Sequence, residues 1–379
     1  MFRSSLCFLI LIGCTSPNES SLDRVVIPIE KPILKISAVV EEIDYTTLHD
    51  IPSYFLGNID KIILAEDLII AGDISIKPGI IIYDLNGNVK GSINHFGEGP
   101  GEFTHINDFS YDPIKKLIIL SMVGKIIYYD LEGNFVKESR TETLYYKFIS
   151  IDDNQILFYL PQVSAQEFIG SGYENGILFL ENPEVKNSKR ILHHTFNKET
   201  KTPYMMERDV FQTGISGEIA FSHYFNDTIY ILDRELRTTR KILVDLGEYK
   251  LDNRHFEGYD SEIDALNDLG NKALNQNQLL YDGEYLGGRI LQDGNTFFFI
   301  SNLKKQDTWS IGNFENDLDG VMSYLQLRAL KEKTLYSVHR IEELPPYILE
   351  NPSKYNFPEN ITDNLYFIAK YKLKELDND

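Results

Sequence analysis

The chain has 379 residues, of which 42% are hydrophobic and 12% aromatic, and its formal net charge is −20 at pH 7. This hydrophobic content is enough for a large buried core and argues against disorder. The acidic balance argues against nucleic acid and anionic lipid headgroups as partners, because a negative surface repels both.

The N-terminus has the features of a bacterial lipoprotein signal. Arg3 precedes an apolar run over residues 6–12 that is too short to span a bilayer as a helix. The sequence Leu-Ile-Gly-Cys ending at Cys14 resembles the lipobox, in which the signal is cut before a cysteine that is then acylated. The alternative is an ordinary signal peptide with an incidental cysteine.

The lipobox predicts the first two segments of the chain. Residues 1–13 are the signal peptide, and residues 14–29 are a tether anchored by lipid on Cys14. We expect a cell-envelope location at the outer membrane, with the periplasmic and surface sides both open. Cys7 leaves with the signal, so the domain over residues 30–379 has no thiol for a disulfide, a metal site or a nucleophile.

A repeat dominates the first half of the domain. The sequence IIYDLNGNV at 81–89 recurs as IYYDLEGNF at 127–135, and a strand-like run precedes each copy, at 68–71 and 117–120. Asn-Gly and Glu-Gly-Asn between apolar runs indicate hairpin turns, because glycine accepts the positive φ of tight turns. Units of this length made of short strands are typical of the blades of a β-propeller.

Weaker copies of the pattern follow and complete the predicted fold. Paired strand-like runs occur at 155–159 with 176–180, at 218–221 with 228–233, and at 296–300 with 308–311; one more lies at 364–369. We predict an all-β, six-bladed β-propeller in which an early strand at 33–40 completes the C-terminal blade. That closure removes a free sheet edge.

One region departs from the strand pattern. Residues 259–280 place apolar side chains at helical spacing, and Asp260 or Ser261 could cap the start. We expect a helical insertion near 259–280, either as a packing face or as a lid or partner contact. Residues 321–330 are a second helix candidate.

The stretch HFGEGPGEF at 95–103 suggests three interpretations. A phosphate loop is disfavoured, since Glu98 and Glu102 repel phosphate and no Lys-Ser or Lys-Thr follows. A metal site could use these glutamates and His105, although turn glutamates are usually solvated. The favoured interpretation is a crossing from the outer edge of one blade to the inner strand of the next, which the glycines permit.

These motifs resemble a known family. GEGPGEF after a YDLxGN repeat, the segment NDTIY at 226–230 and the lipobox together resemble the six-bladed β-propeller lipoproteins of Bacteroidetes, which are related to NHL-repeat propellers. The resemblance covers most of residues 30–375. It implies a six-bladed fold and an envelope location, and it carries no settled activity.

The sequence leaves the function open between two classes. We favour a non-catalytic ligand- or protein-binding or scaffold module, with Glu102, His105 and Asn107 as candidate ligand-facing residues. Its partners are the membrane, through the anchor, and a glycan, peptide or envelope protein; no nucleic acid and no cofactor are expected. The alternative is a lyase or hydrolase that holds Zn²⁺ or Ca²⁺ on the propeller axis. Its weak candidate ligands come from different repeats: His105, His223 and His339.

Overall fold

The structure is a computed structural model of the chain. It describes residues 21–29, 34–51, 54–141, 143–151, 155–160, 176–185, 187–193, 209–223, 226–251, 255, 268, 270–276, 278–355 and 357–374.

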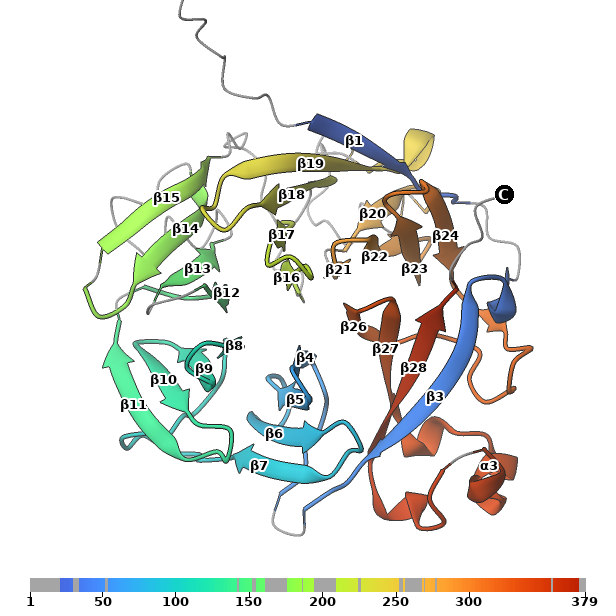
Figure 1. The fold of residues 1–379 in the computed structure, drawn as a ribbon, viewed down its shortest axis with the longest axis horizontal. Coiled ribbons are helices and arrows are strands. Elements are labelled where there is room, and N and C mark those ends of the chain that lie inside the picture. Colours follow the sequence, from blue (N-terminus) through green and yellow to red (C-terminus); the bar gives the residue numbers. More distant parts are fainter. Residues whose placement is uncertain are drawn as a thin grey trace, which may run out of the picture.

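Six antiparallel sheets are arranged around a common axis, which makes the fold a six-bladed β-propeller (Figure 1). Blade 1 contains β4 (Lys61–Ala65), β5 (Leu68–Asp73), β6 (Gly79–Asp84) and β7 (Val89–Ile93). Blade 2 contains β8 (Asp108–Asp112), β9 (Leu117–Met122), β10 (Lys125–Tyr129) and β11 (Phe135–Arg140). Blade 3 contains β12 (Lys147–Ser150), β13 (Ile156–Tyr159), β14 (Gly176–Asn182) and β15 (Asn187–His193). The six-bladed fold predicted from the repeats is therefore confirmed.

The remaining blades follow the same plan. Blade 4 contains β16 (Phe211–Thr213), β17 (Ile219–Phe221), β18 (Thr228–Leu232) and β19 (Thr238–Asp245). Blade 5 contains β20 (Ala273–Asn275), β21 (Leu280–Tyr281), β22 (Tyr285–Gln292), β23 (Asn295–Asn302) and β24 (Asp307–Ile311). Blade 6 contains β26 (Leu327–Lys331), β27 (Thr334–Arg340), β28 (Tyr366–Leu373) and β3 (Val40–Leu48). In blades 1 to 4 and in blade 6 the strand that comes first within the repeat lies innermost. In blade 5, β20 and β21 both pair with β22, and β21 lies nearer the axis (Figure 1).

The ring is closed by β3, which pairs antiparallel with β28 from Leu48↔Tyr366 to Val40↔Leu373. Closure of the C-terminal blade by an early strand was predicted, but the predicted residues 33–40 were too early. Most of that range forms instead the short strand β2 (Leu34–Lys35), which pairs with β25 (Phe314–Glu315), and a 3-10 turn over Ile36–Ala38. Pairing with β28 begins only at Val40, where β3 starts.

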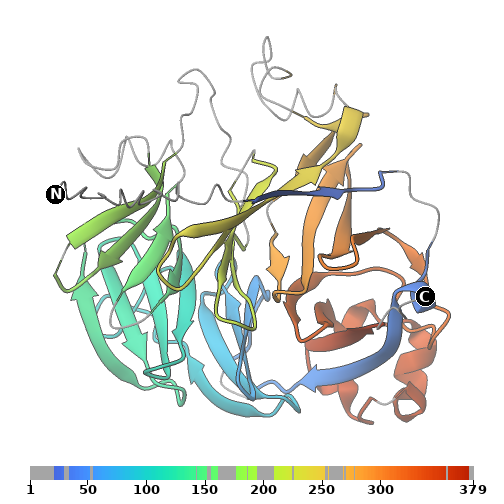
Figure 2. The same ribbon diagram turned by 45° about the horizontal axis from the view of Figure 1, so that its top comes forward.

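A further strand, β1 (Ser21–Val26), runs parallel to β19 and becomes the fifth strand of blade 4. Figure 2 shows it along the outer rim, extending from blade 4 toward blade 5. The predicted tether over residues 14–29 therefore needs correction, because residues 21–26 belong to the folded domain. Val25 and Ile27 are buried in the core cluster between blades 4 and 5, which explains why this segment docks.

The helix predicted over residues 321–330 is not formed. Of the helical insertion predicted near 259–280, Asp268 is helical, but the C-terminal part forms strands. Ala273 and Leu274 lie in β20 and Leu280 in β21, while residues 256–267 fall outside the described residues. Of residues 321–330, the last four belong to β26. The helix α3 (Pro346–Glu350) is a single short turn between β27 and β28. Further 3-10 turns occupy Gly247–Tyr249, Ile341–Glu343, Pro352–Tyr355 and Ile361–Asp363. In the described part of the chain no helix has the length and apolar character needed to cross a bilayer.

The hydrophobic core consists mainly of layers between neighbouring blades. The layer between blades 1 and 2, for example, joins Ile70 and Ile82 of blade 1 to Phe109, Ile118 and Leu120 of blade 2. Aromatic and β-branched side chains suit this role because they fill the space between two twisted sheets. Each blade thus buries both faces, which accounts for the nearly continuous apolar strands β6 and β9.

Candidate functional site

The repeated YDLxGN motif forms the turn between the third and fourth strands of a blade. In blade 1, Asp84 Oδ1 accepts hydrogen bonds from the backbone N–H groups of Asn86 (3.0 Å) and Asn88 (2.9 Å). These bonds, led by the one from Asn88, lower the pKa of the Asp84 carboxyl to about 2. Asp130 makes the same contacts with Glu132 and Asn134 in blade 2. The motif is therefore a turn capped by a side chain, in which the aspartate carboxylate accepts hydrogen bonds from backbone N–H groups of the turn.

The HFGEGPGEF loop crosses from outer strand β7 of blade 1 to inner strand β8 of blade 2, as predicted. It packs on blade 2, where Tyr129 Oη donates to the Gly101 carbonyl at 2.7 Å and His95 stacks on the Tyr129 ring at 5.8 Å. Glu102 closes the loop locally, because its Oε2 accepts from the Gly99 N–H at 2.8 Å. The Glu102 carboxylate therefore stabilises the conformation of the loop itself.

Of the three candidate ligand-facing residues, Asn107 is the one that adjoins an inner strand. It precedes Asp108 at the start of β8, and its Nδ2 is buried without a hydrogen-bond partner among the described residues. His105 is bound to its neighbours: Nδ1 lies 3.1 Å from Thr104 Oγ1, and Nε2 accepts from the Val123 N–H at 3.3 Å. Glu102 is engaged with Gly99 as described above.

The three histidines considered as metal ligands do not form one site. His223 lies in an aromatic cluster with Phe221 and Tyr230, with Nε2 2.6 Å from Asn226 Nδ2. His339 is buried in β27, where Nε2 lies 2.8 Å from Ser337 Oγ, and burial lowers the pKa of its imidazole. Within the described residues there is no group of three His, Cys, Asp or Glu side chains placed to hold a metal ion.

A set of polar residues that the sequence did not reveal surrounds the axis. Each inner strand carries one charged or amide side chain at or near its start, and we call this set the axial ring: Lys61, Asp108, Lys147, Asp209, Gln278 and Arg328. All except Lys61 are buried. The signal that could have found them is a polar residue recurring at the start of otherwise apolar inner strands, which becomes visible only once the blades are aligned.

Hydrogen bonds connect ring members across the blade boundaries. Lys61 Nζ donates to Asp108 Oδ1 at 2.9 Å and to the Phe109 carbonyl at 2.8 Å, joining blades 1 and 2. Asp108 Oδ2 in turn accepts from the Phe148 N–H of blade 3 at 3.1 Å. One carboxylate therefore joins three inner strands.

The other side of the ring is joined in the same way. The Leu279 N–H of blade 5 donates to the Asp209 carbonyl at 2.8 Å, and Gln278 Nε2 donates to the Leu327 carbonyl of blade 6. Arg328 Nε donates to the Ile59 carbonyl beside blade 1 at 3.2 Å. These bonds satisfy buried polar groups and hold the inner strands at fixed separations.

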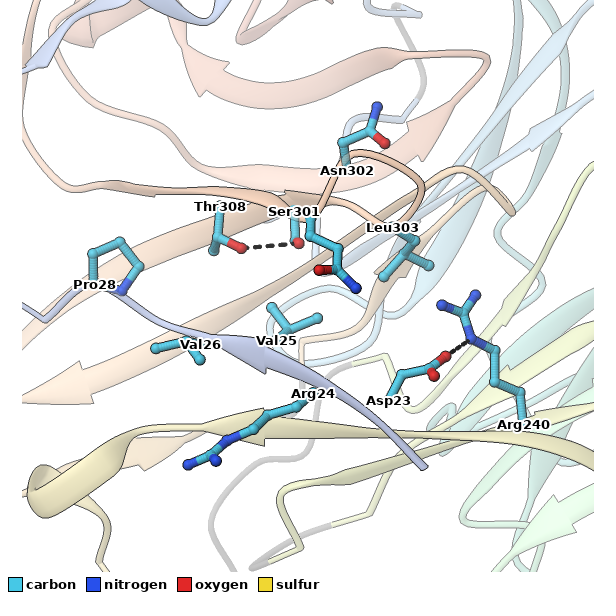
Figure 3. Close-up of a pocket in the computed structure, with 11 residues that line it drawn as sticks. Asp23, Arg24, Val25, Val26, Pro28, Arg240, Ser301, Asn302, Leu303 and Thr308 are labelled. Carbon is cyan, nitrogen blue, oxygen red and sulfur yellow. Dashed lines mark hydrogen bonds and ion pairs between the residues drawn. The ribbon is translucent and has the colours of Figure 1, made fainter. Parts of the chain in front are cut away.

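A separate pocket of about 360 Å³ lies on the outer rim between β1, β19 and the β23–β24 turn (Figure 3). Its charged side chains are paired: Asp23 with Arg240, and Arg24 with Asp245. Thr308 Oγ1 donates to Ser301 Oγ at 3.0 Å across its floor. The pocket exists because β1 docks here, and its polar groups mainly hold β1 in place.

Comparison with known proteins places this fold in a family. Residues 24–378 match the family described as "Domain of unknown function (DUF4934)". The chain belongs to the DUF4934 family. This match includes the second half of β1, from Arg24 to Val26, which agrees with the place of β1 in the folded domain. No match was found among the curated proteins.

Solved structures from Bacteroides share the fold of this DUF4934 protein. One is described as an exported protein from Bacteroides fragilis; it has a TM-score of 0.71 at 13% identity, and the alignment covers 94% of this chain and 100% of that one. Another is a member of the DUF4221 family from Bacteroides vulgatus, with a TM-score of 0.52 at 12% identity over 89% and 98% of the two chains. At these identities the likeness concerns the fold alone.

Proposed function

We propose that this DUF4934 protein is a non-catalytic binding module of the cell envelope, held at the membrane by lipid on Cys14. The observation that carries the proposal is the axial ring, which fixes charged side chains at the centre of a rigid propeller. Preorganised polar groups of this kind favour recognition of a ligand, since little ordering is needed when the ligand arrives.

The location rests on two lines of support. The lipobox at Cys14 predicts acylation, and a structural neighbour from Bacteroides fragilis is described as exported. Two or more acyl chains give stable anchoring, whereas one chain gives only marginal binding. A glycan, a peptide or another envelope protein would meet the propeller at the end of the axis where the inner strands begin.

Site-specific photo-crosslinking in living cells tests this binding face. A photoreactive residue at position 105 stands just before β8, and one at the exposed Ile114 stands in the β8–β9 turn at the opposite end of the same strand. We expect discrete crosslinked species from position 105 and none from position 114. Equal crosslinking at both positions, or none at 105, would overturn the proposed binding face.

A further inference from the structure

The rim pocket between β1 and blade 5 has the size of a small ligand site. Its volume of about 360 Å³ is at the lower end of the range for pockets that hold small molecules, roughly 300–1,000 Å³. Strand β1 forms one wall, and β19 with the β23–β24 turn forms the other (Figure 3). The pocket therefore fits a molecule of about one ring.

The charges of the lining are already balanced. Its three charged side chains are Asp23, Arg24 and Arg240. Arg240 is paired with Asp23, and Arg24 is paired with Asp245. A charged ligand would have to compete with these ion pairs and would find no unpaired charge opposite it. The balance therefore favours a neutral ligand.

The Asp23–Arg240 pair keeps hydrogen-bonding capacity. Arg240 Nε donates to Asp23 Oδ2, while Asp23 Oδ1 and the Arg240 Nη groups have no hydrogen bond to any residue that the structure describes. The two side chains are 37% and 31% exposed, so water satisfies these atoms and a ligand can replace that water. A carboxylate only accepts and a guanidinium only donates, and a hydroxyl group can pair with either.

Deeper in the pocket, a hydroxyl pair lies beside aliphatic surface. Ser301 is 1% exposed, and its Oγ accepts from Thr308 Oγ1 at 3.0 Å. With this bond made, the Ser301 O–H has no acceptor in the described part of the chain. Val25 and Leu303 supply apolar surface (Figure 3). None of the described lining residues is aromatic, so the pocket offers no ring on which a nucleobase would stack.

We propose that the rim pocket binds a neutral polyhydroxylated molecule of the size of one sugar ring. Asp23 Oδ1 accepts from one hydroxyl of the ligand, an Arg240 Nη group donates to a second, and the Ser301 hydroxyl donates to a third. The C–H faces of the ring pack on Val25 and Leu303. Because β1 forms one wall, the bound ligand also stabilises the docking of β1.

Saturation-transfer NMR titration of the full chain tests the site, in a detergent whose headgroup is not a sugar. The probes are the methyl glycosides of glucose, galactose and mannose, with glucuronate and glucosamine as charged counterparts. We expect saturable binding of at least one neutral glycoside and weaker binding of both charged sugars. Binding by neither kind, or tighter binding of a charged sugar, would overturn the proposal.

Variants assign the binding to the pocket. Arg240→Met should weaken it by at least about tenfold, because hydrogen bonds to a charged group are lost. The matched control is Arg237→Met, which removes an arginine of the same blade that pairs with Asp233 at 2.7 Å outside the pocket. Thr308→Val leaves the β1 ion pairs intact and should also weaken binding. Equal affinities in Arg240→Met and Arg237→Met would contradict the site.

Hydrogen exchange of the wild type locates the ligand without any substitution. At a saturating concentration of the bound glycoside, amide exchange should slow in residues 21–27 and 301–308 and stay unchanged in β10 of blade 2. Unchanged exchange at 21–27 would place the ligand elsewhere and overturn the proposal. The crosslinking test at position 105 concerns the axial end of the propeller, so either proposal can fail while the other holds.

Discussion

Lys61 and Asp108 form an ion pair across the boundary between blades 1 and 2, with Nζ and Oδ1 2.9 Å apart and the Asp108 side chain 2% exposed. Because Asp108 also accepts from the Phe148 N–H, this side chain couples three blades. Asp108→Asn should lower the free energy of unfolding by about 3 kcal/mol, since it leaves a largely buried ammonium without its charge partner. Urea denaturation followed by tryptophan fluorescence measures the change.

The control for that variant is a solvent-exposed pair of the same type. Lys116 and Glu66 lie 3.4 Å apart with both side chains more than half exposed. Glu66→Gln should change the free energy of unfolding by less than about 1 kcal/mol. Similar losses in the two variants would show that the axial pair contributes no more than a surface pair.

Gly87 of the first YDLxGN turn lies against the outer strand of the preceding blade. It has φ of +83°, and a Cβ there would meet the Thr47 carbonyl oxygen at 1.9 Å. Gly124 has nearly the same φ, +84°, with nothing within 4 Å of a Cβ. Gly124→Ala should cost about 1 kcal/mol for its backbone angle alone, and Gly87→Ala about 2 kcal/mol more because β3 must shift.

Thermal denaturation of the two alanine variants side by side gives this difference directly. Gly87 and Gly124 share a backbone conformation, so that contribution cancels. Equal midpoints for the two variants would mean that the glycine of the repeat is needed for the turn alone and has no role in the contact between blades.

The repeat was readable in the sequence because its determinants are local. Asp84 and Asp130 cap turns only two to four residues away, and the strands beside them alternate or run apolar over short windows. The closing strand was harder to place, because its pairing with β28 spans almost the whole chain. The C-terminal part of the helical insertion expected near 259–280 is a strand for a related reason: pairing with β22 decides the conformation of Ala273–Asn275 over local spacing.

The axial ring could not be predicted, because its members are brought together only by closure of the propeller. Lys147 and Asp209 belong to consecutive blades yet stand 62 positions apart, with nothing in the residues around either that marks them as neighbours. Asn107 was chosen for its position after the GEGPGEF crossing, and it does lie beside Asp108. Its position follows from where a crossing must end, and the same reasoning did not extend to the other five inner strands.

Asp209 should make the protein less stable as pH rises. Its folded-state pKa is raised above the ordinary value of 3.8, so the folded state binds the proton more tightly than the unfolded state. The resulting stabilisation is fully present below pH 3.8 and is lost as pH rises through the folded-state pKa. Asp209→Asn should therefore exceed the wild type in stability at pH 7, with the gap closing toward acid pH.

Urea denaturation of the wild type and Asp209→Asn at several pH values measures this gap. A wild type that is more stable than Asp209→Asn at pH 7 would contradict the expected direction and would mean that the cations around Asp209 outweigh its burial.

Strands β1 and β3 should differ in their importance for folding. A chain starting at residue 29 lacks β1 and should still unfold cooperatively, because blade 4 keeps its four antiparallel strands. A chain starting at residue 49 also lacks β3. Its loss exposes the edge of β28 and the core side chains that pack against Val40 and Leu48 in the full chain. We expect it to aggregate; size-exclusion chromatography and limited proteolysis distinguish the two chains, and a monomeric, protease-resistant second chain would contradict the closure role of β3.

Acylation of Cys14 would place a particular part of the propeller near the bilayer. Six residues separate Cys14 from Ser21, the first residue of β1. Even fully extended, this segment reaches only about 24 Å. The rim of blade 4 should therefore lie close to the membrane surface. The turn of blade 1 that contains Leu85 lies elsewhere on the ring, and no short segment ties it to Cys14 (Figure 1).

Fluorophores at the exposed positions Leu22 and Leu85 test this orientation in reconstituted vesicles that contain a headgroup-linked quencher. We expect strong quenching at position 22 and weak quenching at position 85. Cys14→Ala should abolish both signals and move the protein to the soluble fraction, because two or more acyl chains carry the anchoring energy. Membrane association that survives Cys14→Ala would contradict the lipid anchor, and equal quenching at the two positions would contradict the orientation while leaving the anchor intact.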